Sequence, residues 1–246
     1  MAHRLSRRIA LGGCAAFALA GPAHGQSDGV EVGETQILTD GGPVPGVFAK
    51  PVGPGPFPIV LVAENGAGLD RVVTDTCHGL AKEGFFAVAP ALFRDDPPDG
   101  TIMRRLDGAG TWAMQHGGDL SHLGIVGFGP GGRVAWLYDA YSPVVKAAVV
   151  WYGPVQGAAT PARPITVLEA ARHLNAPLLG LYGQGSNIPK SALLDLEAQA
   201  KRAGKTVNIV TFVGAGPNFA APGSAGYDPA ATVDGWKRAI KWLREH

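Results

Sequence analysis

The glycine-rich turn at residues 127–132 has the spacing of a nucleophile elbow, the sharp turn that exposes a nucleophilic side chain for acyl transfer. It follows an apolar run at 123–126 and precedes a helical pattern at 133–141. In the G-x-nucleophile-x-G register, the nucleophile position is Gly129, and the next residue is Pro130, which has no N–H to donate to an oxyanion. The turn is therefore expected to keep its shape without this chemistry. Glycine would also relieve the backbone strain of such a turn.

Polar side chains follow several predicted strands. Glu64 comes directly after the apolar run 58–63. Its carboxylate is either a general base held in a desolvated pocket or a structural acid that accepts hydrogen bonds from loop N–H groups. Ligands of parallel sheets bind at the carboxyl ends of the strands, so other residues at these positions are candidates for ligand binding. They are Asn65, Arg94, Tyr152, Asn187 and Asn218.

An acidic loop and a set of aromatic residues each allow two interpretations. Asp95, Asp96 and Asp99 offer oxygen ligands for a divalent cation, but no ligand spacing repeats, which favours a solvated acidic loop. We therefore predict no metal and no cofactor. The aromatic residues either line a pocket or belong to the core. They are Trp151, Tyr152, Tyr182 and Phe219.

The histidines are not expected to supply a base at this edge. His116, His122 and His173 all precede predicted strands, which places them at the opposite rim of the sheet. His78 lies in a predicted helix beside Cys77, but adjacent helical side chains do not face each other. We therefore do not expect these two residues to act as thiol and base.

The elements that must position these residues are strands that alternate with helices. Apolar runs predict buried strands, and amphipathic patterns predict helices. The predicted strands are 58–63, 85–91, 123–126, 145–151, 177–182 and 207–213. The predicted helices are 71–83, 101–115, 133–141, 167–172, 190–203 and 228–245. With an antiparallel lead-in at 26–56, this order predicts an α/β fold whose mostly parallel central sheet has helices on both faces.

Residues 1–25 have the features of a removable export signal. Arg7 and Arg8 precede a short apolar stretch at 9–20, and small residues follow, which indicates the twin-arginine route. The stretch falls short of the roughly 20 apolar residues that span a bilayer, so an uncleaved anchor is the weaker alternative. Lipoprotein processing at Cys14 leaves too little apolar chain. We predict a periplasmic or secreted protein whose residues 26–246 form one domain.

The net charge limits the classes of binding partner, and the cysteine content limits the disulfides that the chain can form. The chain carries 21 basic and 20 acidic side chains, and loss of residues 1–25 removes three arginines and leaves a net charge of −2. This balance does not call for nucleic acid or an anionic membrane as a partner. After residue 25 only Cys77 remains, so no intramolecular disulfide is available.

Several short segments in combination resemble the dienelactone hydrolase family over essentially the whole chain after residue 25. The resemblance implies the α/β-hydrolase fold and, for the family, the hydrolysis of small esters or lactones by a Cys-Asp-His triad. The segments include Ala203-Gly204-Lys205, Gly214-Ala215-Gly216, Tyr227-Asp228-Pro229-Ala230-Ala231, Ala81-Lys82-Glu83-Gly84-Phe85, Gly127-Phe128, Gly131-Gly132-Arg133 and Tyr152-Gly153.

The positions that match the family triad carry other residues. The cysteine position is Gly129, the aspartate position is Ser186 or Asn187, and the histidine position is Pro217. By this resemblance, none of these residues supports the family mechanism. Glu64 matches a glutamate that modulates the cysteine in the family.

Two functions from different classes follow. The first is a non-hydrolytic protein that binds a small molecule or a partner in the former active-site pocket. The second is an enzyme with other chemistry, an isomerase, a lyase or a triad-free hydrolase, acting on a small ester, lactone or carboxylate with Glu64 as general base. Its hydrogen-bond donors would be Asn65, Ser186, Asn187 or Asn218. We favour the first, because the sequence shows no convergent acid and base pair.

Overall fold

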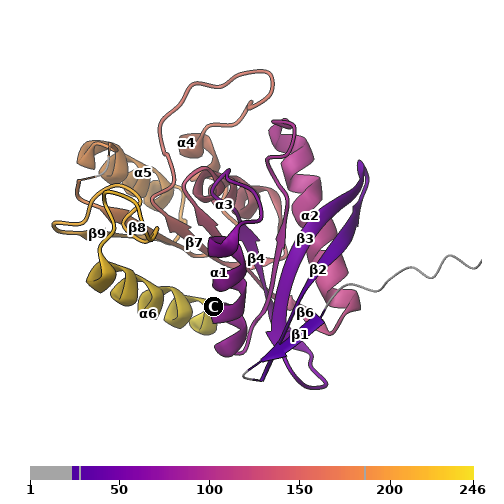
Figure 1. Cartoon of the computed structure of the whole chain (residues 1–246). Helices are drawn as coiled ribbons and strands as arrows, with labels where there is room; N and C mark the ends of the chain where they lie inside the picture. Colours follow the sequence, from indigo (N-terminus) through magenta and orange to yellow (C-terminus); the bar gives the residue numbers. More distant parts are fainter. Residues whose placement is uncertain (1–23, 28, 186) are drawn as a thin grey trace, which may run out of the picture.

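A nine-stranded sheet runs through the described part of the chain, with the strand order β1-β2-β3-β5-β4-β6-β7-β8-β9 (Figure 1). This computed structural model describes residues 24–27, 29–185 and 187–246. Helices lie on both faces of the sheet (Figure 1). The predicted α/β fold with a mostly parallel sheet is therefore confirmed.

The N-terminal strands pair in antiparallel fashion. They are β1 (His24–Ser27), β2 (Val30–Thr39) and β3 (Gly42–Pro51), and β3 joins the rest of the sheet through β5. Thr39 pairs with Gly42, so the β2–β3 hairpin closes over Asp40 and Gly41, two residue types that favour tight turns. This hairpin is the antiparallel lead-in that the sequence predicts.

The remaining strands pair in parallel. They are β4 (Phe57–Ala63), β5 (Phe86–Pro90), β6 (Gly118–Phe128), β7 (Val145–Trp151), β8 (Leu178–Gly183) and β9 (Val207–Phe212). Every residue of β5 and β8 is buried, as expected for strands that are covered on both faces. Because the strands are parallel, the residues that follow them meet at one edge of the sheet.

Two groups of helices enclose two hydrophobic layers. On one face lie α1 (Arg71–Lys82) and α6 (Pro229–Glu245). On the other lie α2 (Asp99–Gln115), α3 (Pro130–Tyr141), α4 (Val167–Ala170) and α5 (Lys190–Arg202). Asp70 caps α1 by accepting the Val73 N–H at 3.0 Å, which satisfies a backbone donor that the first turn leaves free. Within the described residues, no helix is both long enough and apolar enough to cross a bilayer.

The main departure from the predicted elements is at β6. The strand begins at Gly118, five residues before the predicted start at 123. His122 therefore lies inside β6 and not ahead of it, which corrects the prediction that it precedes the strand. Its side chain is exposed and its ring Nδ1 lies 2.7 Å from Asp119 Oδ2, so it remains on the surface of the strand's first half.

Candidate functional site

The turn after β6 has the backbone of a nucleophile elbow. Gly129 has φ 51° and ψ −121°, a conformation that strains residues with a side chain. Its N–H donates to the Trp151 carbonyl at 3.0 Å, and its own carbonyl accepts the N–H groups of Gly132 and Arg133 at 2.9 and 3.3 Å. A Cβ built at Gly129 would meet no atom within 4 Å. The turn thus has room for a side chain where the nucleophile of such an elbow stands.

The neighbouring glycines, in contrast, have no room for one. A Cβ at Gly131 would lie 2.2 Å from the Ala63 carbonyl oxygen, and a Cβ at Gly127 would lie 2.1 Å from the Gly131 carbonyl oxygen. A Cβ at Gly132 would lie 2.7 Å from the Gly153 Cα. These contacts press the start of α3 against the ends of β4 and β7, and they fix the elbow without using its central residue.

Pro130 is the first residue of α3 and is exposed. Proline suits this position of a helix because its fixed φ is helical and the N–H it lacks would be unpaired there. Its ring lies beside the loop after β4, since a Cβ at Gly66 would be 3.7 Å from the Pro130 Cγ. A backbone N–H at residue 130 would be the oxyanion donor of an elbow, and proline removes it.

Glu64 is buried and ties two loops together. Its Oε2 accepts the Gly68 N–H at 2.5 Å, and its Oε1 accepts the N–H groups of Leu92 and Phe93 at 3.0 and 3.3 Å. One carboxylate thus satisfies three backbone donors of the loops that follow β4 and β5. Because most of its acceptor positions are occupied by the protein, these bonds favour the structural interpretation of Glu64 over that of a general base.

The acidic residues after β5 have arginine partners. Asp99 is buried and forms a bidentate pair with Arg133 at 2.7 and 2.9 Å, and Arg133 also donates to the Ile165 carbonyl at 3.0 Å. Asp96 accepts from Arg163 at 2.7 Å. These bonds join the 95–99 loop to the start of α3 and to the 153–166 loop, which arches above α3 in Figure 1. The acids of this loop therefore act in ion pairs, with no group of three or more metal-binding side chains among the described residues.

The bidentate pair of Arg133 and Asp99 is the feature of this edge that sequence reasoning missed. The two residues are 34 positions apart, and their side chains are only 18% and 9% exposed. The available signal was a single arginine in the first turn of a mostly apolar helix. Such a charge needs a partner when it is buried.

The predicted ligand-binding residues lie on the loops at this edge. Asn65 is half-buried and its Oδ1 accepts the Ala67 N–H at 2.9 Å, which stabilises the turn after Glu64. Arg94 is exposed, with Asp95 3.7 Å away. Asn187 and Asn218 are also exposed.

The two other positions that match the triad do not add a reactive group to the described structure. Pro217 is exposed in the loop between β9 and α6, and a proline ring offers no proton acceptor for catalysis. Ser186 lies outside the described residues. The structure thus brings Gly129, Glu64 and their loops to one edge of the sheet, but it does not bring a nucleophile and a base together there among the residues it describes.

Three of the four aromatic candidates belong to the core. Trp151, Tyr182 and Phe219 have no exposed surface. Tyr152 is half-buried, and its ring stands edge-on to Phe219 with a centroid distance of 5.7 Å. Burial raises the pKa of the Tyr152 phenol, so this hydroxyl stays protonated near neutral pH and is a neutral hydrogen-bond group.

Cys77 does not form a reactive pair with His78. Its side chain is buried in the hydrophobic layer beneath α1, and this burial raises the pKa of the thiol to about 12. His78 is partly exposed on the same helix. The thiol is therefore protonated and inert, in agreement with the sequence prediction.

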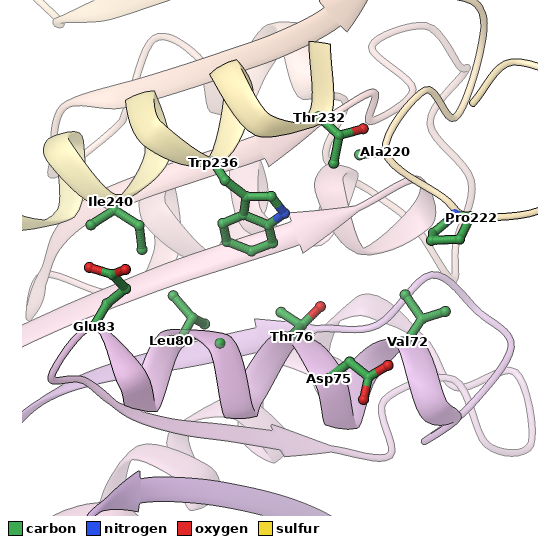
Figure 2. A pocket seen from close by; sticks show the side chains of 11 residues that line it. Val72, Asp75, Thr76, Leu80, Glu83, Ala220, Pro222, Thr232, Trp236 and Ile240 are labelled. Atoms are coloured by element: carbon green, nitrogen blue, oxygen red, sulfur yellow. The ribbon is translucent and has the colours of Figure 1, made fainter. Parts of the chain in front are cut away.

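A separate groove of about 360 Å³ lies between α1 and α6 (Figure 2). Trp236 and Ile240 of α6 face Leu80 and Thr76 of α1 across it (Figure 2). Three polar side chains of its walls are already bonded: Thr232 donates to backbone carbonyls, Asp75 pairs with Arg71 and Glu83 pairs with Arg244. This groove lies on the opposite face of the sheet from α3 and has an apolar lining without convergent reactive groups.

Comparison with known proteins assigns the chain to a family. Residues 44–246 match the dienelactone hydrolase family. A protein of Yersinia pestis named "Putative carboxymethylenebutenolidase" is 36% identical over 242 residues, which covers 90% of this chain and 91% of that protein. An Escherichia coli protein of the same name is 35% identical over 240 residues, 89% of each chain.

Solved structures agree with this assignment. A Klebsiella pneumoniae crystal structure titled "Putative Dienelactone Hydrolase" has a TM-score of 0.85 at 34% identity and covers 88% of this chain and 99% of that one. A dienelactone hydrolase-like promiscuous phosphotriesterase from metagenomic libraries has a TM-score of 0.74 at 19% identity over 88% and 98% of the two chains, which supports the fold alone. The elbow, the strand order and these matches together show that the chain belongs to the dienelactone hydrolase family.

Proposed function

We propose that this protein binds a small molecule at the former active site of a dienelactone hydrolase without hydrolysing it by the covalent mechanism of the family. The observation that carries the proposal is the elbow. Its backbone has the strained turn that presents a nucleophile, and the residue at that turn is Gly129, which has no atom able to form an acyl enzyme.

The surroundings of Gly129 support the same conclusion. Pro130 has no N–H at the position that would bind an oxyanion, and the loss of one such donor alone costs about 3 kcal/mol of transition-state stabilisation. Pro217, at the position of the family histidine by sequence resemblance, cannot accept a proton from a nucleophile. Three separate requirements of the mechanism are unmet, so restoring any one of them would not be enough.

The competing proposal is an enzyme that uses Glu64 as general base. A base must accept a proton from the substrate, whereas the Glu64 carboxylate already accepts three backbone N–H groups. Protonation would weaken these bonds and release the two loops that form the rim. We therefore favour binding over catalysis at this site.

The chemistry of the rim favours a small anionic or carbonyl ligand. Arg94 provides an exposed cation whose nearby acid, Asp95, is itself 85% exposed, a pairing that is weak in water. Asn65 and Asn218 provide neutral amide groups, and Tyr152 provides a neutral hydroxyl. Small carboxylates, lactones and esters match this combination of one positive charge with neutral donors.

One experiment separates binding from hydrolysis. Small carboxylates, lactones and aryl esters are titrated calorimetrically into the full chain, and each is then recovered and assayed for conversion. We expect at least one compound to bind and to be recovered unchanged, and to stabilise the fold by about 2.7 kcal/mol at roughly 100 times its Kd. Arg94→Gln should weaken binding roughly tenfold or more, while Arg202→Gln, an exposed arginine at the end of α5, should not.

Two results would overturn the proposal. Multiple turnover of any bound ester or lactone would establish an enzyme, and loss of that turnover in Glu64→Gln would assign it to the competing mechanism. Binding of none of the compounds would remove the evidence for a retained ligand site.

We also propose that the protein is exported and that its signal is cleaved after Ala20. The predicted signal lies in residues 1–25, of which 1–23 are outside the described structure. His24 and Gly25 form the first half of β1, where they pair with Gly33 and Val32. Cleavage after Gly25 would remove half of this strand, whereas cleavage after Ala20 leaves it intact. N-terminal sequencing of the exported protein tests this, and a mature chain that begins at Gln26 would contradict it.

A further inference from the structure

Strand β9 is an unprotected edge of the sheet. Among the strands of the described residues it pairs only with β8, and none of its residues is fully buried. Val207, Ile209, Val210 and Phe212 are each half-buried, and the residue that follows the strand, Val213, is 84% exposed. Apolar side chains thus continue to the last strand of the sheet, where one side of the backbone has no strand beside it.

The directions of the free backbone groups follow from the pairing of β9 with β8. The carbonyls of Thr206 and Phe212 accept the N–H groups of Leu178 and Gln184 at 3.0 and 2.9 Å, so the even-numbered residues of β9 face β8. Backbone groups alternate along a strand, and residues 207, 209 and 211 of β9 therefore direct their N–H and C=O groups away from the sheet. Within the described structure, no hydrogen bond reaches these outward groups.

The sequence of β9 lacks the features that keep an edge strand from pairing with another strand. Natural sheets protect their edges with charged side chains, prolines, bulges or very short strands. The chain has no charged residue from 206 to 227, and β9 itself contains no proline and pairs with β8 in unbroken register. The opposite edge differs, because β1 is four residues long and β2 beside it carries Glu31 and Glu34.

We propose that β9 pairs in antiparallel fashion with β9 of a second copy of this chain, so that two nine-stranded sheets become one. The outward groups are placed symmetrically about Ile209. Ile209 would exchange two hydrogen bonds with Ile209 of the partner subunit, and Val207 would do so with Thr211 of the partner subunit. Each strand then satisfies every outward group of the other between residues 207 and 211.

A second copy fits this edge for two reasons. The first is the symmetry of the outward groups, which a two-fold axis through Ile209 uses in full. The second is charge. An uncharged strand can pair with an identical strand without electrostatic repulsion, and it has no opposite charge that would attract a charged peptide. Strand pairing alone buries little surface, so the dimer should dissociate on dilution.

Sedimentation of the full chain tests the proposal. We expect a dimer at roughly 100 µM that dissociates toward monomer at about 1 µM. Thr211→Pro removes an outward N–H that β8 does not use, a position where an edge strand tolerates proline, and it should be monomeric throughout. Thr211→Val keeps the backbone and the strand preference, and it should dimerise as the wild type does.

Two further measurements prevent an ambiguous result. Thr211→Lys places a charge at an exposed edge position, so it should weaken the dimer at least tenfold even if the proline variant misfolds. Amide exchange should show Val207, Ile209 and Thr211 protected only in the dimer, with Asn208 and Val210 protected in both states. A wild-type monomer up to about 1 mM, or dimers that persist in both Thr211→Pro and Thr211→Lys, would overturn the proposal.

Discussion

The elbow at Gly129 and the carboxylate at Glu64 lie at the same edge of the sheet and differ in what they retain. The elbow keeps a strained backbone conformation and has no side chain to use it. Glu64 has an ionisable side chain, and its carboxylate oxygens accept hydrogen bonds from three backbone N–H groups. The first region thus has the backbone of a nucleophile turn without a nucleophilic side chain, and the second has an ionisable side chain that accepts backbone hydrogen bonds.

This difference indicates that the backbone conformation of the elbow does not depend on a nucleophilic side chain at residue 129. The elbow is set by close contacts among Gly127, Gly131, Gly132 and their neighbours, and none of these contacts involves a side chain at residue 129. A hydrolase-like turn therefore persists for packing reasons. Substitutions in the two regions should therefore change stability through these contacts.

The largest effect is expected from Gly131→Ala. Its Cβ would lie 2.2 and 2.3 Å from the carbonyl oxygens of Ala63 and Glu64, which are backbone atoms that cannot swing away. Unfolding in urea should show a loss of at least about 3 kcal/mol. Gly79→Ala is the matched control, since its Cβ would meet nothing within 4 Å and it lies in α1, where alanine is favoured by up to about 1 kcal/mol. Equal stability of the two variants would show that the close packing around the elbow is unimportant.

Glu64→Ala should have the next largest effect. It leaves the N–H groups of Gly68, Leu92 and Phe93 without their acceptor, which we expect to cost about 2 to 3 kcal/mol. Glu64→Gln retains one carbonyl oxygen and should cost less. If both variants unfold at the wild-type denaturant concentration, Glu64 does not hold the two loops, and the catalytic interpretation of this residue gains support.

A second buried carboxyl provides the contrast to Glu64. Asp139 of α3 accepts the N–H groups of Asn175 and Ala176 through Oδ1 at 3.0 and 2.8 Å, while its Oδ2 has no partner among the described residues. Burial raises its pKa to about 7 from an ordinary value of 3.8. The folded protein therefore holds this proton more tightly than the unfolded chain, and the resulting stability is lost as pH rises from about 4 to about 7.

Comparison with Asp139→Asn isolates this effect. Between pH 5 and pH 8, the stability of the wild type relative to the variant should fall by about 2 kcal/mol in urea unfolding. A difference that stays constant with pH would show that Asp139 does not titrate in this range.

The sequence predicted the fold more fully than the site. Continuous apolar runs located the buried strands, but the first residues of β6 include Asp119, Ser121 and His122, which no apolar pattern marks. The two interpretations of Glu64 could not be separated, because its partners Leu92 and Phe93 lie 28 and 29 residues away and donate from the backbone. The Arg133–Asp99 pair was missed for the same reason, since a contact over 34 residues depends on the packing of α2 against α3. Short-range spacing found the elbow because a tight turn is a local structure.

The central claim is that the elbow is now scaffold, and Gly129→Cys tests it most directly. The side chain would occupy open space at the nucleophile position, so the variant should fold, at a cost of about 1 to 3 kcal/mol for a side chain in this backbone conformation. We predict that neither the wild type nor Gly129→Cys releases product from an aryl ester above the uncatalysed rate, because Pro130 still removes one oxyanion donor and Pro217 still provides no base. A burst of product equal to the enzyme concentration, or sustained turnover by either protein, would contradict this account.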